Sequence, residues 1–192
     1  MTRRSGHHTP VAGGKPRQIA LDTLLRSQRQ QAAAERLLAD TLREAKLSSA
    51  DAGLARELVS GCVRWRRLLD WLIERATDGR EQKPAVQEIL RLGLYQIFFL
   101  NRIPDHAIAD ESVRLAKRNK CVGQAGFINA MIRRFLREKE TIFRDISTIQ
   151  EDRPALGQSH PDWLFDNWEQ SWGREKTIRL LEWNNQPAPT YA

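Results

Sequence analysis

The chain has 192 residues and a mass of 22.1 kDa, and its 31 Lys and Arg residues exceed its 24 Asp and Glu residues. The resulting net charge of +7 favours a polyanionic partner such as nucleic acid. Two cysteines are too few for a disulfide scaffold or a Cys-rich zinc site, and they indicate a reducing compartment, so we expect a cytoplasmic protein. The longest apolar run, at 97–100, is far shorter than the ~20 residues that cross a bilayer, which argues against a membrane partner.

The N-terminal residues carry Gly, Pro, Ser and His without helical periodicity, and we expect residues 1–15 to form a disordered leader. From Pro16 onward, apolar residues recur at helical spacing, and no stretch predicts a strand of useful length. After Ser48, which is placed to cap a helix, one apolar stripe has successive spacings of 4, 4, 3, 4 and 3. Its members are Leu54, Leu58, Cys62, Trp65, Leu69 and Leu72. The stripe predicts a helix that either continues to Ala76 or bends near Gly61.

A helix that begins near Pro84 is apolar over a wide arc, which is typical of the central helix of a bundle. Two amphipathic helices are expected to follow it, at about 106–119 and 124–140. The sequence therefore predicts an all-α fold whose main part is a helical bundle over 16–140.

Beyond this bundle the apolar periodicity fades, and Pro154 and Gly157 appear, so we expect a linker at 141–158. Tryptophan-rich stretches with helical spacing come next. They predict a short helical extension over 159–192.

The positive charge is concentrated at 114–139, which contains eight basic residues and one acidic residue, Glu138. The basic residues are Arg114, Lys117, Arg118, Lys120, Arg133, Arg134, Arg137 and Lys139. This stretch carries +7, which equals the whole net charge, so the rest of the chain is neutral in sum. Such a concentration indicates polyanion binding more strongly than the overall charge does.

The basic residues of this stretch are expected on the outer faces of the helices at 106–119 and 124–140, opposite their apolar faces. Two adjacent helices with basic outer faces would form a groove for a phosphate backbone. Arginines of earlier helices extend the set. The candidate RNA-binding residues are Arg17, Arg64, Arg66, Arg114, Lys117, Arg118, Arg133, Arg134 and Arg137. The alternative is that these side chains form the solvated faces of an amphipathic bundle.

The sequence contains no complete active site. Cys62 falls on the apolar stripe, where a cysteine acts as a small hydrophobe, and Cys121 lies near Lys120 but has no base partner. Asp105 before His106 is more typical of a helix cap beside a packing histidine than of a catalytic pair. No Gly-rich phosphate loop is present. We therefore assign no catalytic, cofactor-binding or metal-binding residue.

Four segments of the bundle and one of the extension form an ordered set. The bundle segments are Asp51-x-x-Leu54-x-Arg56-Glu57-Leu58-Val59-x-Gly61-x-Val63-Arg64, Leu90-Arg91-Leu92-Gly93-Leu94-Tyr95-Gln96, Ile103-Pro104-Asp105-His106-Ala107 and Gly126-Phe127-Ile128-Asn129-Ala130-Met131-Ile132-Arg133-Arg134-Phe135. The extension has Ser159-His160-Pro161-x-Trp163-Leu164, then Trp168, Gly173 and Asn184-Asn185-x-Pro187. Together they resemble the NusB-like N-terminal domain of the bacterial ribosomal RNA small-subunit cytosine-C5 methyltransferase B family, with the start of the RNA-binding region that follows it there.

The resemblance implies a NusB-like bundle that captures and positions RNA for an S-adenosylmethionine-dependent enzyme, which makes 5-methylcytosine in ribosomal RNA. In that family a Rossmann-like catalytic domain holds the cofactor and supplies cysteines in Pro-Cys and Thr-Cys motifs. Neither Cys62 nor Cys121 stands in such a motif. We therefore expect this chain to lack the catalytic domain, to hold no cofactor and to be inactive alone. The implied partners are ribosomal RNA and a catalytic domain onto which the bundle docks.

Two other interpretations stay open. The first is a stand-alone antitermination factor of the NusB type, which shares the helical domain, binds RNA and works with a ribosomal protein. Such a factor would not need the tail after about residue 145, with its Trp163, Trp168 and Trp172. The second is purely structural: the bundle docks onto its own catalytic half and the charge is incidental. The sequence indicates neither an oligomeric state nor a particular RNA site.

Overall fold

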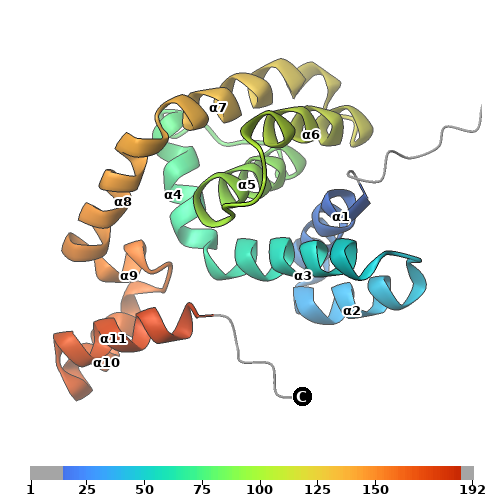
Figure 1. The fold of residues 1–192 in the computed structure, drawn as a ribbon. Helices are drawn as coiled ribbons and strands as arrows, with labels where there is room; N and C mark the ends of the chain where they lie inside the picture. The colour runs from blue at the N-terminus through green and yellow to red at the C-terminus, as the bar shows by residue number, and fades with distance from the viewer. Residues whose placement is uncertain (1–14, 187–192) are drawn as a thin grey trace, which may run out of the picture.

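The structure is a computed structural model that describes residues 15–186. The leader expected at 1–15 therefore lies outside the described residues, except for Lys15, which begins the first helix. Every regular element of the described range is a helix, which confirms the all-α prediction (Figure 1). The elements are α1 (Lys15–Gln30), α2 (Ala34–Glu44), α3 (Ser49–Arg64), α4 (Arg66–Ala76), α5 (Pro84–Phe99), α6 (Asp105–Arg118), the short 3-10 helix η2 (Val122–Gln124), α7 (Ala125–Arg137), α8 (Lys139–Asp152), α9 (Pro154–Gly157), α10 (Asp162–Trp172) and α11 (Arg174–Asn184).

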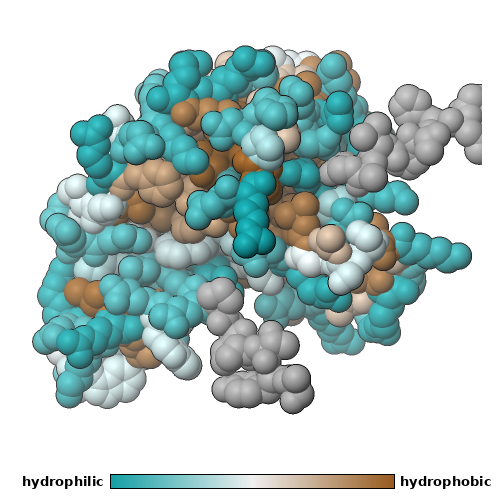
Figure 2. All heavy atoms as spheres, viewed as in Figure 1, coloured by the Kyte–Doolittle hydropathy of each residue, from teal (hydrophilic) through white to brown (hydrophobic). Residues whose placement is uncertain are grey.

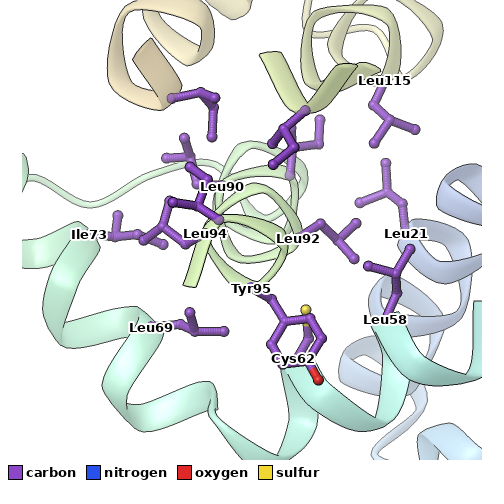
Figure 3. Packing of buried hydrophobic residues seen from close by; sticks show 14 of the residues in the cluster. Leu21, Leu58, Cys62, Leu69, Ile73, Leu90, Leu92, Leu94, Tyr95 and Leu115 are labelled. Atoms are coloured by element: carbon purple, nitrogen blue, oxygen red, sulfur yellow. The ribbon is translucent and has the colours of Figure 1, made fainter. Parts of the chain in front are cut away.

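Helix α5 is the centre of the bundle, as its wide apolar arc predicts. It starts with Pro84 in its first turn and is buried from Glu88 to Phe98. Helices α1, α3, α4, α6 and α7 all pack against it. Leu92 points toward the α1 and α3 side of the core, whereas Leu90 and Leu94 point toward α4 (Figure 3). Each such fully buried leucine contributes roughly 1.5–3 kcal/mol relative to an exposed one.

Two glycines allow neighbouring helices to lie close to α5. A Cβ added at Gly61 of α3 would stand 1.9 Å from the Cζ atom of Tyr95. One added at Gly93 of α5 would stand 2.3 Å from the Cδ1 atom of Ile132 on α7. Both glycines therefore serve helix packing.

The apolar stripe that begins at Ser48 is divided between two helices. The Ser48 side chain caps α3 as predicted, accepting a hydrogen bond from the Asp51 amide at 3.1 Å. The bend lies at Trp65, and not near Gly61 as one of the two expectations had it. Trp65 has φ −96° and ψ 14°, and it ends α3 and precedes α4. Its ring stacks on Phe99 at 4.5 Å between centroids, so the bend places an aromatic side chain against the end of α5.

The linker expected at 141–158 is wrong as a structural description, because these residues form most of α8 and all of α9. Ile142 and Ile146 of α8 join the main core. They are the fully buried residues of that helix, so its apolar stripe is too narrow to stand out in the sequence. A Cβ at Gly157 would stand 2.5 Å from the Cα atom of Gln150, which shows how closely α9 lies against α8.

The C-terminal helices α9, α10 and α11 have a small core of their own, formed by Ala155, Phe165 and Leu181. In Figure 1 they lie at the opposite end of the molecule from α6. Most of the surface in this orientation is polar, and apolar atoms gather near the middle of the view, over α4 and α5 (Figure 2). No helix in the described part of the chain has the length and apolar character needed to cross a membrane.

Candidate nucleic-acid interface

Helices α6 and α7 are packed against each other, which confirms that the two helices expected to carry the basic faces are neighbours. They run in opposite directions, joined by η2 (Figure 1). The basic residues of each helix lie in its C-terminal half, so the antiparallel arrangement places the two sets at opposite ends of the pair. Arg133 lies eight residues after Ala125, which corresponds to roughly 12 Å along α7. The single basic groove expected from the sequence is therefore two separate groups of cations.

The first group is on α6. Arg114 is about half exposed and donates to the Glu111 carboxylate at 2.7 Å. Lys117 and Arg118 are exposed and have no hydrogen bond or ion pair with any other described residue. These two cations can meet phosphate groups without first breaking an internal pair.

The second group is on α7, and all three of its arginines are exposed. Arg133 donates to the Asn129 side-chain oxygen at 3.1 Å, and Arg134 forms an ion pair with Glu138 at 3.1 Å. Arg137 has no partner in the described part of the chain. The Arg134 pair is exposed on both sides, so its net contribution to stability is at most about 1 kcal/mol and it opens readily to a phosphate.

Arg17 has a different position from the one expected. Its residue is only 7% exposed, and its Nε atom donates to the Gln96 side-chain oxygen at 2.7 Å. Burial lowers the pKa of this guanidinium, and the nearby Glu111 carboxylate opposes that shift. Arg17 therefore joins α1 to α5 inside the protein, and we leave it out of the surface proposed below. The sequence hides this role because Gln96 is 79 residues away.

Arg64 and Arg66 stand on either side of the bend between α3 and α4, away from both groups of α6 and α7 (Figure 1). Arg64 is half-buried. Arg66 is nearly half exposed and lies 3.8 Å from the buried Glu88 carboxylate. Burial raises the pKa of Glu88, while Arg91 and Arg66 oppose the rise. Arg66 therefore serves partly to balance a buried charge.

A cleft along α1 contains cations that are not among the candidate residues from the sequence. Arg26 and Arg29 of α1 and Lys83, just before α5, lie along it. The cleft reaches Cys121, next to the exposed Lys120 at the end of α6. Arg26 and Arg29 are three residues apart on one helix, a spacing that puts them on one face and that a helix-by-helix charge map would have found. Lys83 belongs to the same site only through the fold.

The cysteines and the histidine at α6 do not form a chemical site. Burial raises the pKa of the Cys62 thiol strongly, so it stays protonated. Cys121 is buried and its sulfur lies 3.4 Å from the Asn119 carbonyl. Asp105 is the first residue of α6 and not its cap, because Pro104 holds that position and no side chain caps the helix. No group of three or more His, Cys, Asp or Glu side chains in the described range could hold a metal ion.

Comparison with known proteins identifies the family of the bundle. The sequence profile of the NusB family matches residues 14–137, which is more than half of the chain. The chain belongs to the NusB family. Its bundle is also similar in fold to the solved structure of NusB from T. maritima, with a TM-score of 0.55 and 20% identity over 68% of this chain and 94% of that one.

The chain is also similar to longer proteins. It is 37% identical over 149 residues to the probable ribosomal RNA small subunit methyltransferase B of Synechocystis sp., covering 76% of this chain and 33% of that protein. It is 35% identical over 165 residues to the protein of the same description from Bacillus subtilis, covering 85% of this chain and 37% of that protein. The resemblance found in the motifs is therefore confirmed. The chain spans about a third of the length of these relatives.

Several motif residues have structural roles. Tyr95 packs against Gly61 and donates to the Glu57 carboxylate, and Gln96 accepts the bond from Arg17. Gly93 lies against Ile132. These residues shape the fold and lie away from the exposed cations. The final motif position, Pro187, lies outside the described residues.

Proposed function

We propose that this chain is the RNA-binding NusB-type domain of an S-adenosylmethionine-dependent ribosomal RNA cytosine-C5 methyltransferase, and that it captures and positions the substrate RNA in the cytoplasm. The likeness to the Bacillus subtilis relative carries the proposal. Only 13 residues precede the NusB match, so an alignment over 85% of the chain extends past Arg137 into the C-terminal helices. A stand-alone NusB-type factor gives no reason for that shared extension.

The exposed cations supply the physical basis for RNA capture. An enzyme that modifies one base must first hold the RNA by its backbone and shape. Lys117, Arg118 and Arg137 are exposed and unpaired within the described range, so they can neutralise phosphates. Their two groups, separated along the α6–α7 pair, suit an extended strand better than a single phosphate.

Catalysis in this proposal belongs to a separate domain onto which the bundle docks. S-adenosylmethionine would be bound there, because the resemblance places the cofactor on a Rossmann-like sheet and the described residues contain no strand. The partners of this chain are thus ribosomal RNA and that catalytic domain.

A charge-reversal pair tests RNA binding. Arg133→Glu with Arg137→Glu should weaken binding of a ribosomal RNA fragment at least roughly tenfold and lower its salt dependence by about two phosphate contacts. Fluorescence anisotropy at several salt concentrations measures both quantities. The control pair, Arg36→Glu with Arg56→Glu, makes the same charge change on exposed residues of α2 and α3 and should have a smaller effect. Equal loss in the two pairs would contradict the assigned surface.

Removing the C-terminal helices distinguishes this proposal from the stand-alone factor. The cut belongs after Asp152, because Ile142 and Ile146 of α8 are part of the main core. We expect the remaining chain to fold and bind RNA, and to lose its ability to assist a catalytic domain supplied separately. Full function of the shortened chain in antitermination would favour the stand-alone factor.

A further inference from the structure

One cleft lies along α1 and has a volume of about 880 Å³. That size is within the range of ordinary ligand sites. Its walls are mainly apolar and come from four places in the sequence. The apolar residues are Ile19, Leu25, Pro84, Ala85 and Cys121. The cleft is thus built by the fold, from α1, Thr41 of α2, the start of α5 and the turn after α6.

Three of the four charged side chains at the cleft are cationic, and two of them, Arg26 and Arg29, also attract the fourth, Asp22. Arg26, Arg29 and Lys83 form no ion pair or hydrogen bond with another described residue. The one acidic lining residue, Asp22, accepts a hydrogen bond from the Gln18 amide at 3.0 Å. The cleft therefore combines an apolar interior with an excess of positive charge.

A buried polar atom without a partner also belongs to this cleft. Thr23 lines it, is 1% exposed, and its hydroxyl oxygen has no hydrogen bond within the described range. Leaving a buried hydroxyl unpaired costs about 1–3 kcal/mol. The hydroxyl oxygen itself is not exposed, so a ligand in the cleft would pair with it only after the Thr23 side chain rotates.

We propose that the cleft receives an unstacked nucleobase of single-stranded RNA, with the guanidinium groups of Arg26 and Arg29 against the base and Lys83 on the adjoining phosphate. This inference rests on the proposed RNA-binding function and adds a base-binding site to it. Bases of single-stranded RNA splay out, enter pockets and stack on guanidinium planes, while the backbone follows positive charge. The surplus of unpaired cations favours this polyanion over a protein segment as the occupant.

The cleft is continuous with the first group of α6 cations. Gln18 of α1 exchanges two hydrogen bonds with Asn119, at 3.0 and 3.1 Å, just after α6. Cys121, which lines the cleft, comes directly after Lys120 in the sequence. A strand that leaves the cleft therefore meets Lys117, Arg118 and Lys120, whereas the α7 arginines lie farther along.

The test compares two oligonucleotides with equal phosphate charge: a short single-stranded oligouridine and the same backbone made abasic. Wild-type protein should bind the oligouridine roughly tenfold or more tightly than the abasic strand. Changing Arg26, Arg29 and Lys83 together to Ala should weaken oligouridine binding and remove most of that preference. The control changes Arg36, Lys46 and Arg56, three exposed cations of the α2–α3 region, to Ala and should keep the preference. Circular dichroism establishes that each variant is folded.

The possible outcomes distinguish failure of the base site from failure of the proposed RNA-binding function. Salt-dependent binding by wild-type protein that is equal for both strands would overturn the base site and leave the RNA-binding function intact. Base preference that survives in the cleft variant would also overturn the site and would place base binding elsewhere on the protein. No binding of either strand, even at low salt, would contradict the proposed function itself.

Discussion

The bundle and the C-terminal helices are held by different means. The bundle has one continuous core of more than thirty buried apolar residues, arranged around α5. The C-terminal helices share a core of three buried residues, Ala155, Phe165 and Leu181. Their outer surface exposes Trp163, which is 68% exposed, and Trp183, which is 67% exposed. The bundle is thus stabilised by burial, whereas the C-terminal helices have little apolar area of their own to bury.

Polar bonds compensate for the small C-terminal core. The Arg67 side chain of α4 contacts the His160 carbonyl and the Asp162 carboxylate. The backbone amide of Arg67 donates to the Ser159 hydroxyl at 2.9 Å. The side-chain amide of Asn185 donates to the Gln158 backbone carbonyl at 2.9 Å. Directional bonds of this kind fix an orientation, and each contributes about 0.5–1.5 kcal/mol. The C-terminal helices are therefore positioned by the bundle more than they are stabilised by their own packing.

The largest expected effect is in the bundle. Arg91→Ala should destabilise the whole protein by about 3–5 kcal/mol, because it leaves the buried Glu88 carboxylate with only the longer contact to Arg66 and also removes the pair with Asp70. Arg66→Ala removes the longer, half-exposed contact to the same Glu88 and should cost at most about 1 kcal/mol. Chemical denaturation followed by circular dichroism measures both. A similar small loss in the two variants would show that the buried pair does not hold the bundle.

The second-largest loss of stability should be confined to the C-terminal helices. Leu181 is fully buried at the centre of the small core, so Leu181→Ala should destabilise α10 and α11 by about 2–5 kcal/mol and leave the bundle transition unchanged. Hydrogen exchange of the α10 and α11 amides reports the loss. Leu180→Ala, on the same helix but outside the core, is the matched control. If Leu181→Ala also lowered the stability of the bundle, the two regions would form one cooperative unit.

A smaller effect is expected where the two regions meet. Arg67→Ala should loosen the C-terminal helices by about 1–3 kcal/mol, because the His160 carbonyl and Asp162 lose their partner. Arg75→Ala breaks an exposed ion pair with Asp145 at 2.7 Å and should cost less than about 1 kcal/mol. Faster exchange of the α10 amides in the first variant alone would support the account. Equal hydrogen exchange in both variants would show that Arg67 does not hold the C-terminal helices against the bundle.

The smallest effect is a pH dependence of the C-terminal helices. Burial lowers the pKa of His160, against a hydrogen bond to the Gln158 carbonyl that raises it. Because the folded pKa lies below the ordinary value of about 6.5, protonation favours the unfolded state. The stabilisation is present above that value and is lost as the pH falls through it; half-exposure keeps it under about 1 kcal/mol. Tryptophan fluorescence during acid titration measures it, since Trp168 lies 6.5 Å from His160 between ring centroids. His160→Gln should remove the dependence, and an unchanged titration would refute it.

Much of the fold could be predicted from the sequence because its signals are local. The cap at Ser48, the first-turn Pro84 and the wide apolar arc of α5 each depend on residues within a few turns. Helix α8 was missed because Ile142 and Ile146 alone bury its face, and two residues do not make a visible period. The position of the bend at Trp65 depends on stacking against Phe99, which a local pattern does not contain.

The candidate site was less predictable, because it depends on packing between residues that are far apart in the sequence. Charge counting found the exposed cations of α6 and α7, but it could not separate them into two groups, because that depends on the antiparallel packing. It also included Arg17, whose partner Gln96 is brought close only by the fold. The cleft cations were missed because Lys83 is far from α1 in the sequence. Net charge locates a polyanion surface only as far as burial and pairing allow.

The most direct test of the account is RNA binding by the whole chain at several salt concentrations, with a ribosomal RNA fragment and an unrelated RNA of equal length. We predict binding that weakens steeply as salt rises, with a slope set by the phosphates neutralised, and tighter binding of the ribosomal fragment. Absence of binding to either RNA at low salt would contradict the central claim and would leave the basic faces as a solvated surface.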